Sequence, residues 1–288
     1  MNKLRVIDGG LFTTVQDYGR PGFRKYGVPV SGVMDMKSFD LANKLVGNQK
    51  GGPLLECTLR GGKYRFENRS LIAITGALMN AKINGGEVSQ NCSLVVKPGD
   101  ELELGFASRG CRTYLALKGN LVLPKIMDSF STYTLGKFGG VQGRILKTGD
   151  ELEWDQPKEK LNPREASKEE IPYFSSKVTV RIIKGPEWEW LSGAVQQEFL
   201  DVKYQVSSQS NRMGIRLEGN SIESPESQMI SSPVIPGIIQ LPPNGNPIIL
   251  MQDGQTIGGY PRIAKVLDED LWRLGQVKAG DTLSFVFC

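Results

Sequence analysis

The feature that most constrains this chain is a succession of short apolar or alternating runs, separated by Gly, Pro, Asn and Asp. Such runs are typical of β-strands joined by turns. Strands alternating with long helical patterns, which would indicate a doubly wound parallel sheet, are missing. The sequence therefore predicts a mainly β fold of two β-barrel or barrel-like domains with a few short helices. The clearest predicted strands are LIAIT, SLVVK, ELELG, TYLALKG, VTVRIIKG, YQVSS, PIILM and TLSFVF.

A short phrase recurs along the chain, as VVKPGDELELG (95–105), ILKTGDELEW (145–154) and QVKAGDTLSFV (276–286). Each copy is typical of a strand, a tight Gly-Asp turn and a second strand. The last two copies each close one half of the chain, which indicates two related β-domains.

The segment PKEKLNPREASKEEIP, residues 157–172, is rich in charge and proline and poor in large apolar residues. Such a segment cannot bury a face, so we predict an exposed linker. It separates a predicted N-terminal domain, 1–156, from a predicted C-terminal domain, 173–288.

Three helices are predicted. In DMKSFDLANKLVGN, Asp35 is the expected N-cap and Gly47 the expected stop. GPEWEWLSGAVQQEF places Pro186 in the first turn of the second helix. DEDLWRL, from Asp268, predicts one short helix.

Composition excludes several classes of function. The chain has 288 residues, a net charge of +4 and no histidine. Without histidine, Ser-His and Cys-His nucleophilic sites are excluded, and the usual ligands of a catalytic zinc are missing. Charge is spread without a basic block, which speaks against nucleic-acid binding. No apolar run reaches the roughly 18 residues of a membrane span, and the first residues lack a signal-peptide core, so we expect a cytoplasmic protein.

Phosphate-binding and nucleophile-elbow motifs are absent, and the four cysteines show no CxxC spacing, so no metal site is expected. Four polar, glycine-rich loops remain. The first, 13–35, joins Asp17, Arg20 and Lys25 to stiffening prolines and suits a small polar or carboxylate ligand. Alternatively it is an ordered Ω-loop in which Asp17 pairs with Arg20.

The second loop, 131–144, is either an anion-binding nest or a hairpin connection. The third, 206–219, presents Arg212 as a ligand clamp or as a barrel-end salt bridge. The fourth follows the strand PIILM and reads QDGQTIGGYPRI, residues 252–263. Functional residues concentrate on loops held by rigid strands, so this loop is the strongest candidate for a binding site.

Motifs from these loops occur in one order from about Val6 to Phe285. They are TTVQDYGRPG, GVPVSGVMD, LANKLVGN, LECTLRGG, ITGA, STYTLGKFGG, QSNRMGIRLEG, PGIIQLPPNGNPIILMQDGQTIGGYPRIAKV and AGDTLSF. On these motifs the chain resembles the biotin-dependent carboxyltransferase / allophanate hydrolase subunit 2 family. Members of that family include the C subunit of bacterial ATP-dependent 5-oxoprolinase, and the KipA proteins.

The resemblance implies two cyclophilin-like β-barrel domains. It implies a component of 5-oxoprolinase that acts with a KipI-like B subunit, and with the A subunit, to open the small molecule 5-oxoproline to L-glutamate. The complex is then expected to use ATP with Mg²⁺. No biotin is expected on this chain, which lacks a Met-Lys-Met signature. Two alternatives stay open: a biotin-dependent carboxyltransferase component acting on urea or a related amide, and a non-catalytic KipA-type antagonist of a kinase inhibitor.

Loop composition and the family motifs together suggest roles for single residues. Arg20 and Arg212 would hold anionic groups. Asp17, Asp35 and Asp253 would orient a substrate N–H or act as base. Substrate contacts and hydrogen bonds are expected from Lys25, Tyr18, Gln240, Gln255, Thr256 and Tyr260. Many relatives carry histidine near the position of Lys25, which here would be a cationic contact instead.

Overall fold

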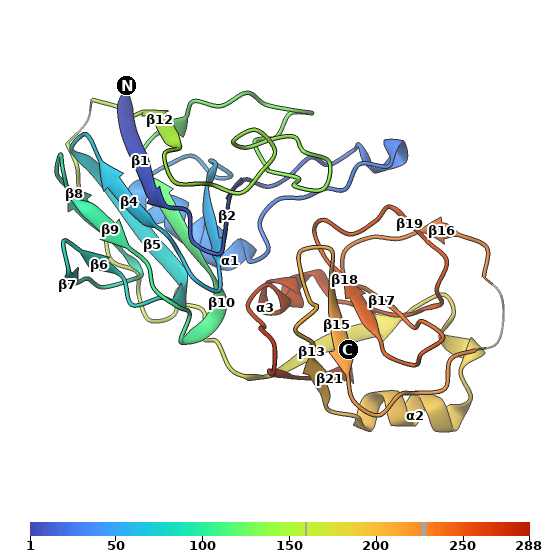
Figure 1. Ribbon diagram of the computed structural model, residues 1–288. Helices are drawn as coiled ribbons and strands as arrows, with labels where there is room; N and C mark the ends of the chain where they lie inside the picture. Colours follow the sequence, from blue (N-terminus) through green and yellow to red (C-terminus); the bar gives the residue numbers. More distant parts are fainter. Residues whose placement is uncertain (159, 226–228) are drawn as a thin grey trace. The chain divides into compact units, whose positions relative to one another are not determined.

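The computed structural model describes residues 1–158, 160–225 and 229–288 (Figure 1). The chain folds into two compact units. One unit contains Met1–Arg20 and Ser31–Phe174, and the other contains Pro21–Val30 and Ser175–Cys288. A ten-residue piece of the N-terminal half therefore belongs to the C-terminal unit. The predicted domain boundaries do not include this exchange, because composition alone does not show where a loop packs.

The first unit contains two antiparallel sheets, drawn mainly in blue and green in Figure 1. Across one sheet the strands are β11 (Asn120–Leu121), β12 (Glu151–Asp155), β1 (Asn2–Asp8), β4 (Lys63–Phe66), β9 (Glu101–Glu103), β6 (Lys82–Ile83) and β7 (Gly86–Glu87). Across the other they are β2 (Phe12–Gln16), β3 (Leu54–Thr58), β10 (Arg109–Leu117), β5 (Ser70–Leu78) and β8 (Cys92–Val96).

Strand β5 is buried on both faces, which explains its nearly continuous apolar run. Ile72 and Ile74 point into the main core of the unit with residues of the other sheet. Leu71 and Ala73 point the other way, into a second cluster formed with Phe39 of helix α1 (Met36–Val46). Alternate residues of a strand face opposite sides, so one strand connects the two cores.

The second unit is built on a closed barrel, which confirms the mainly β prediction. Around the barrel the strands are β13 (Lys177–Lys184), β20 (Arg262–Val266), β17 (Ile238–Gln240), β18 (Ile248–Leu250), β15 (Gly214–Glu218), β14 (Tyr204–Val206) and β21 (Thr282–Phe287). A separate ribbon pairs β16 (Ser232–Pro233) with β19 (Ile257–Gly258). Closure of the barrel removes the unpaired strand edges that an open sheet would expose.

The helix predictions are confirmed at two places and wrong in detail at a third. Asp35 caps α1 by accepting from Ser38 N at 3.1 Å, and Gly47 ends it with φ of 77°. The third helix is present as η3 (Asp268–Asp270) followed by α3 (Leu271–Leu274). The second is broken into η2 (Trp188–Trp190) and α2 (Gly193–Asp201). Ser192, rather than the predicted turn at Pro186, begins α2 by accepting from Val195 N.

Helix α2 is held by aromatic packing against the barrel. Its residue Phe199 stacks on Phe285 of β21, with ring centroids 4.9 Å apart, and also contacts Trp188 and Tyr204. In the part of the chain that is described, no helix is both long and apolar enough to cross a bilayer.

The recurring phrase forms the same turn three times. In each copy the Lys N–H donates to the Asp carboxylate and the Asp N–H donates back to the Lys carbonyl, at Lys97/Asp100, Lys147/Asp150 and Lys278/Asp281. The intervening glycines have φ between 87° and 89°, a conformation that other residues adopt only with strain. The tight turn is thus confirmed. None of the copies is a two-stranded hairpin: in the first, β8 and β9 belong to different sheets, and in the second and third a strand follows the turn but none precedes it.

The predicted linker 157–172 lies within the first unit, where several of its residues are attached. Ser93 N donates to Arg164 O at 2.8 Å, and Ala166 N donates to Asn91 O at 3.0 Å. Leu161 and Ala166 pack against the α1 cluster. The segment is poor in large apolar residues, but these two contacts and the backbone hydrogen bonds to Asn91 and Ser93 suffice to fix this part of it.

Two glycine substitutions test the turn. Gly149 has φ of 89° and open space around an added Cβ, so Gly149→Ala should lower the free energy of unfolding by about 1–2 kcal/mol through backbone strain alone. Gly193 also has open space but begins α2, so Gly193→Ala should raise it by about 0.4–1 kcal/mol. Urea unfolding measures both. Equal effects at the two sites would contradict the assignment of strain to the turn.

Candidate functional site

The strongest candidate site lies in the second unit, around the loop that leaves β18. This loop runs through Asp253 and Gln255 to β19 and then to β20. Of the eleven predicted site residues, the structure brings six together in this unit around the loop and its supports: Arg212, Gln240, Asp253, Gln255, Thr256 and Tyr260. Lys25 belongs to the same unit, while Asp17, Tyr18, Arg20 and Asp35 belong to the other.

Arg212 and Asp253 form a buried, two-pronged ion pair. Nε and Nη2 of Arg212 donate to Oδ2 and Oδ1 of Asp253 at 2.9 and 3.1 Å, and both side chains are 6% exposed. Asp253 N also donates to Arg212 O at 2.9 Å. The pair therefore fastens the third predicted loop to the fourth. Of the two interpretations of Arg212, these contacts favour the structural salt bridge over the ligand clamp.

An amide network lies beneath the loop. Gln240 is buried; its Nε2 donates to Tyr260 O at 3.4 Å and its Oε1 accepts from Gln255 Nε2 at 3.2 Å. A Cβ at Gly258 would come within 2.4 Å of Gln240 Nε2, so a larger residue there would force the end of this side chain to shift. Gln255 and Tyr260 are exposed above the network, and these two can meet a ligand.

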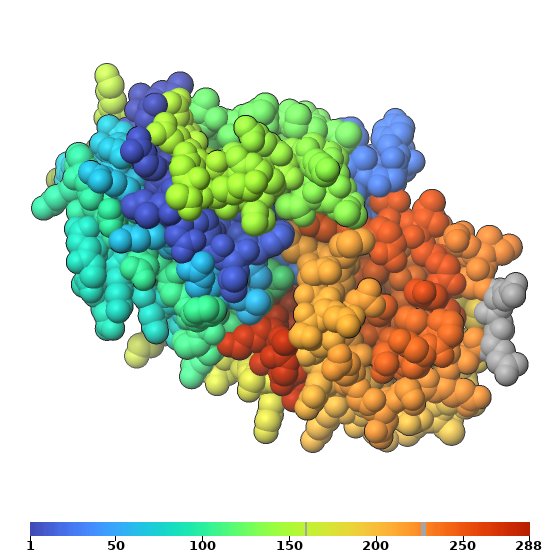
Figure 2. Space-filling view, viewed as in Figure 1, coloured from blue at the N-terminus to red at the C-terminus, as the bar shows by residue number. Residues whose placement is uncertain are grey.

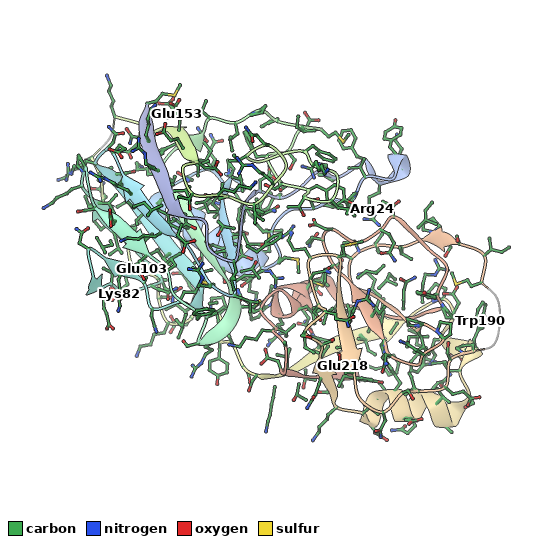
Figure 3. All side chains as sticks on the ribbon, in the orientation of Figure 1. Arg24, Lys82, Glu103, Glu153, Trp190 and Glu218 are labelled. Carbon is green, nitrogen blue, oxygen red and sulfur yellow. The ribbon has the colours of Figure 1, made fainter. Side chains whose placement is uncertain are left out.

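Arg24, which was not assigned a role from sequence, anchors this loop (Figure 3). It lies in the 3-10 turn η1 (Arg24–Tyr26) of the exchanged segment. Its Nη2 donates to Gln255 O at 3.0 Å and to Val234 O. Burial lowers the pKa of the Arg24 guanidinium. The sequence did show an arginine in a proline-stiffened loop, but only the fold shows that it reaches the carbonyls of residues 210 and 231 positions away.

A second unpredicted pair closes the other end of the loop. Arg262 donates from Nε and Nη2 to Glu187 at 2.9 and 2.7 Å, and from Nη1 to Pro233 O at 3.2 Å. Burial acts to raise the pKa of Glu187, but hydrogen bonds from the Arg262 side chain and backbone outweigh it, and the pKa is lowered. Glu187 was overlooked because it follows Pro186 in the first turn of the second predicted helix, where a carboxylate needs no special explanation.

In the first unit, Asp17 and Arg20 each bind the segment 129–140. The Asp17 carboxylate accepts from Ser129 Oγ, Ser131 Oγ and Phe130 N at 2.6, 2.5 and 2.7 Å. Arg20 is fully buried, donates to Ser131 O and lies 4.9 Å from the Phe138 ring centroid. These contacts order a loop and expose neither charge.

The remaining predicted residues also make local contacts. Asp35 is the buried cap of α1, and its N–H donates to Tyr114 OH at 2.8 Å. Tyr18 OH donates to Asp40 at 2.6 Å; burial, aided by Asp40, raises the pKa of Tyr18 well above its usual range. Lys25 is exposed, with Nζ 5.1 Å from the Tyr26 ring centroid. A direct substrate role for these side chains stays a prediction.

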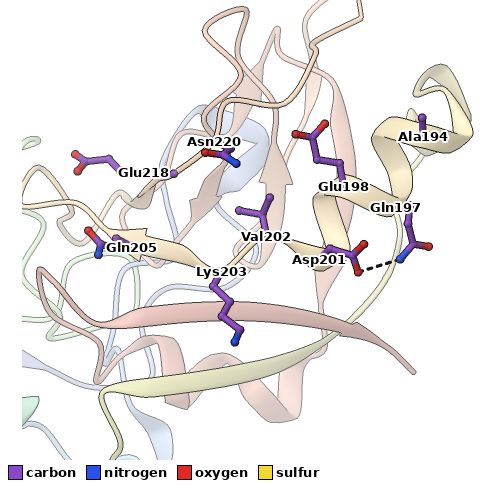
Figure 4. Close-up of a pocket in the computed structure, with 10 residues that line it drawn as sticks. Ala194, Gln197, Glu198, Asp201, Val202, Lys203, Gln205, Glu218 and Asn220 are labelled. Atoms are coloured by element: carbon purple, nitrogen blue, oxygen red, sulfur yellow. Dashed lines mark hydrogen bonds between the residues drawn. The ribbon is translucent and has the colours of Figure 1, made fainter.

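Two surface cavities lie elsewhere. The larger, of about 860 Å³, opens beside α2, β14 and β15 (Figure 4) and is lined by Ala194, Gln197, Glu198, Asp201, Val202, Lys203, Gln205, Glu218, Gly219 and Asn220. The smaller, of about 520 Å³, lies at the end of α1 and is lined by Asp40, Asn43, Lys44, Gly47, Asn48, Lys50 and Arg164. Neither contains a predicted site residue.

The described part of the chain contains no cluster of metal-ligating side chains. Across residues 1–158, 160–225 and 229–288, no group of three or more Asp, Glu or Cys side chains is placed to hold a metal ion. The two arginines predicted to hold anions, Arg20 and Arg212, are buried in internal contacts. We assign no step through ATP to these residues.

The chain belongs to the family described as carboxyltransferase domain, subdomain A and B, which matches residues 26–287. It is 39% identical to the C subunit of 5-oxoprolinase from Escherichia coli, over 99% of this chain and 91% of that protein. The solved urea amidolyase of K. lactis is similar with a TM-score of 0.93 and 35% identity, and a solved structure of TTHA0988 with 0.90 and 29%. Both cover 99% of this chain, which spans only 18% of the former and 56% of the latter.

Removal of one partner of the buried ion pair should be strongly destabilising. Asp253→Ala leaves Arg212 charged in a buried site, so the free energy of unfolding should fall by about 3–5 kcal/mol. The exposed pair Lys184–Glu189 serves as a control, and Glu189→Ala should have little effect. Urea unfolding measures both. Similar small losses would contradict the structural role of Asp253.

Glu187 predicts an acid-sensitive contribution to stability. Its folded pKa lies below the usual 4.5, so its contribution is complete above that pH and is lost as the pH falls through the lower, folded pKa. Glu187→Gln should therefore lower stability near pH 7 and reduce its decline toward about pH 3. Unfolding free energies across this range, for the protein and the variant, provide the measurement. Parallel curves would rule out the assignment.

Proposed function

We propose that this chain is the C subunit of an ATP-dependent 5-oxoprolinase, which acts with a KipI-like B subunit, and with the A subunit. The observation that carries the proposal is the likeness to the E. coli protein of that name, which extends over 99% of this chain and 91% of that protein. The reaction would open the lactam of 5-oxoproline to L-glutamate.

The candidate site favours substrate binding and orientation as the role of this chain. 5-Oxoproline presents a lactam carbonyl oxygen, a lactam N–H and a carboxylate, and amide and hydroxyl side chains can bind all three. Gln255 and Tyr260 are exposed on the loop, and Gln240 holds Gln255 from below. Hydrogen-bond donors fixed before the reaction stabilise a developing oxyanion without a histidine.

The other named residues would position this site. Arg24 fixes the backbone of Gln255, Arg212–Asp253 fixes the start of the loop, and Glu187–Arg262 fixes its end. ATP would be used by the assembled complex.

A second candidate function is carboxyl transfer. It is favoured by the family description and by the similarity to the K. lactis urea amidolyase at a TM-score of 0.93. The carboxyl group would come from carboxybiotin on another chain. The KipA-type antagonist of a kinase inhibitor stays a prediction from the resemblance.

The experiment that distinguishes these functions is release of ADP by this chain with the KipI-like protein and the third component of the complex. It is run with and without 5-oxoproline, and with each component omitted in turn. A 5-oxoproline-dependent release that requires this chain supports the proposal. Turnover that requires carboxybiotin and ignores 5-oxoproline would replace it with carboxyl transfer.

The exposed amide of the site should matter for turnover. Gln255→Ala in the complete complex should lower kcat/KM for 5-oxoproline by about tenfold or more, or about 1.4 kcal/mol, since a substrate hydrogen bond is lost. Gln209→Ala removes another exposed glutamine of the same unit and should leave kcat/KM unchanged. Equal activity of the two variants would remove Gln255 from the site.

A further inference from the structure

The ribbon of β16 and β19 has one buried and one exposed side. Pro233 pairs with Ile257, and Val234 N donates to Thr256 O at 3.0 Å. Val234 is buried, in a cluster with Ile238 and Leu250. Because alternate residues of an extended chain point to opposite sides, Pro233, Ile235 and Ile257 point away from that cluster.

The exposed side is unusually apolar for a loop region. Ile235 is 44% exposed and Ile257 is 59% exposed, and Tyr260, which follows β19, is 44% exposed. Single apolar side chains on a surface are ordinary, but several on one small ribbon are typical of an interaction site.

The exchanged segment adds an aromatic residue to this surface. Arg24 bonds to the carbonyls of Val234 and Gln255, one on each arm of the ribbon. Tyr26, two residues further on in the same 3-10 turn, is 69% exposed. Figure 2 shows this turn, in blue, beside the orange-red surface of the ribbon region. We name Tyr26, Pro233, Ile235, Ile257 and Tyr260 the ribbon surface.

We propose that the ribbon surface is the docking site for the KipI-like protein of the complex, a proposal that rests on the proposed function. The occupant is a folded protein that presents apolar side chains to the isoleucines and hydrogen-bond acceptors to the two tyrosine hydroxyls. Tyrosine suits such interfaces because it combines a large apolar ring with a polar tip.

Two observations favour a protein as the occupant. The relative that this chain nearly spans is named as one subunit of an enzyme, whereas in TTHA0988 and in the K. lactis urea amidolyase the same fold is 56% and 18% of a longer chain. The fold thus occurs joined to further protein in those solved structures. The ribbon surface also adjoins Gln255 and Tyr260, so a docked protein would complete the candidate site.

The test is the affinity of the purified full chain for the purified KipI-like protein, measured by calorimetry without substrate or ATP. Ile257→Asp should weaken binding by about tenfold or more, since a charge would be placed in an apolar contact. The matched control is Ile183→Asp, at an isoleucine of β13 that is 45% exposed, and should bind normally. Tyr26→Ala, which lies outside any strand, provides a second variant that should also weaken binding. Thermal unfolding of each variant shows that it is folded.

Normal binding of the KipI-like protein by both folded variants would overturn the docking site while leaving the proposed function intact. Failure of the unaltered chain to bind the KipI-like protein would contradict both. If the variants lose only self-association, the ribbon surface binds a second copy of this chain. If they lose only binding to the A subunit, it binds that subunit. Either result would also overturn the proposal.

Discussion

The candidate site depends on one buried ion pair. Arg212 and Asp253 lie on loops 41 residues apart in the sequence and bind through two parallel hydrogen bonds out of contact with water. Such a pair gives direction as well as attraction, because the planar guanidinium fits the carboxylate in one geometry. It fixes where the loop leaves β18, and Glu187–Arg262 fixes where the loop enters β20. Gln255 and Tyr260 therefore lie on a short segment that is fixed at both ends. Arg24 adds a third anchor at its middle.

Much of the fold could be predicted because its strands and turns follow from local sequence patterns. The eight clearest strand runs are all strands, and the turn between Lys147 and Asp150 follows from a Gly-Asp pair alone. The exchange of Pro21–Val30 and the attachment of Arg164 to Ser93 could not be predicted in this way. Both depend on hydrogen bonds to the backbone of distant segments. Because backbone groups are the same at nearly every residue, the sequence does not show which of them is bound.

The site was predicted in part, for a related reason. Residue types and loop position predicted the fourth loop as a binding site, and six of the predicted residues lie around it in the structure. They did not distinguish a charge that is offered to a ligand from a charge that is satisfied internally, as at Asp17 with its serine partners. Only the fold shows which charges pair with each other. Arg212 and Asp253, predicted as catalytic residues, pair with each other and position the loop.

We propose that this chain contributes the substrate-binding part of a lactam-opening complex. The most direct measurement is mass spectrometry of the product formed from isotopically labelled 5-oxoproline by the complete complex with ATP and without biotin. We expect labelled glutamate, the substrate plus one water, and no product when this chain is omitted. A carboxylated product, or glutamate formed equally well without this chain, would contradict it.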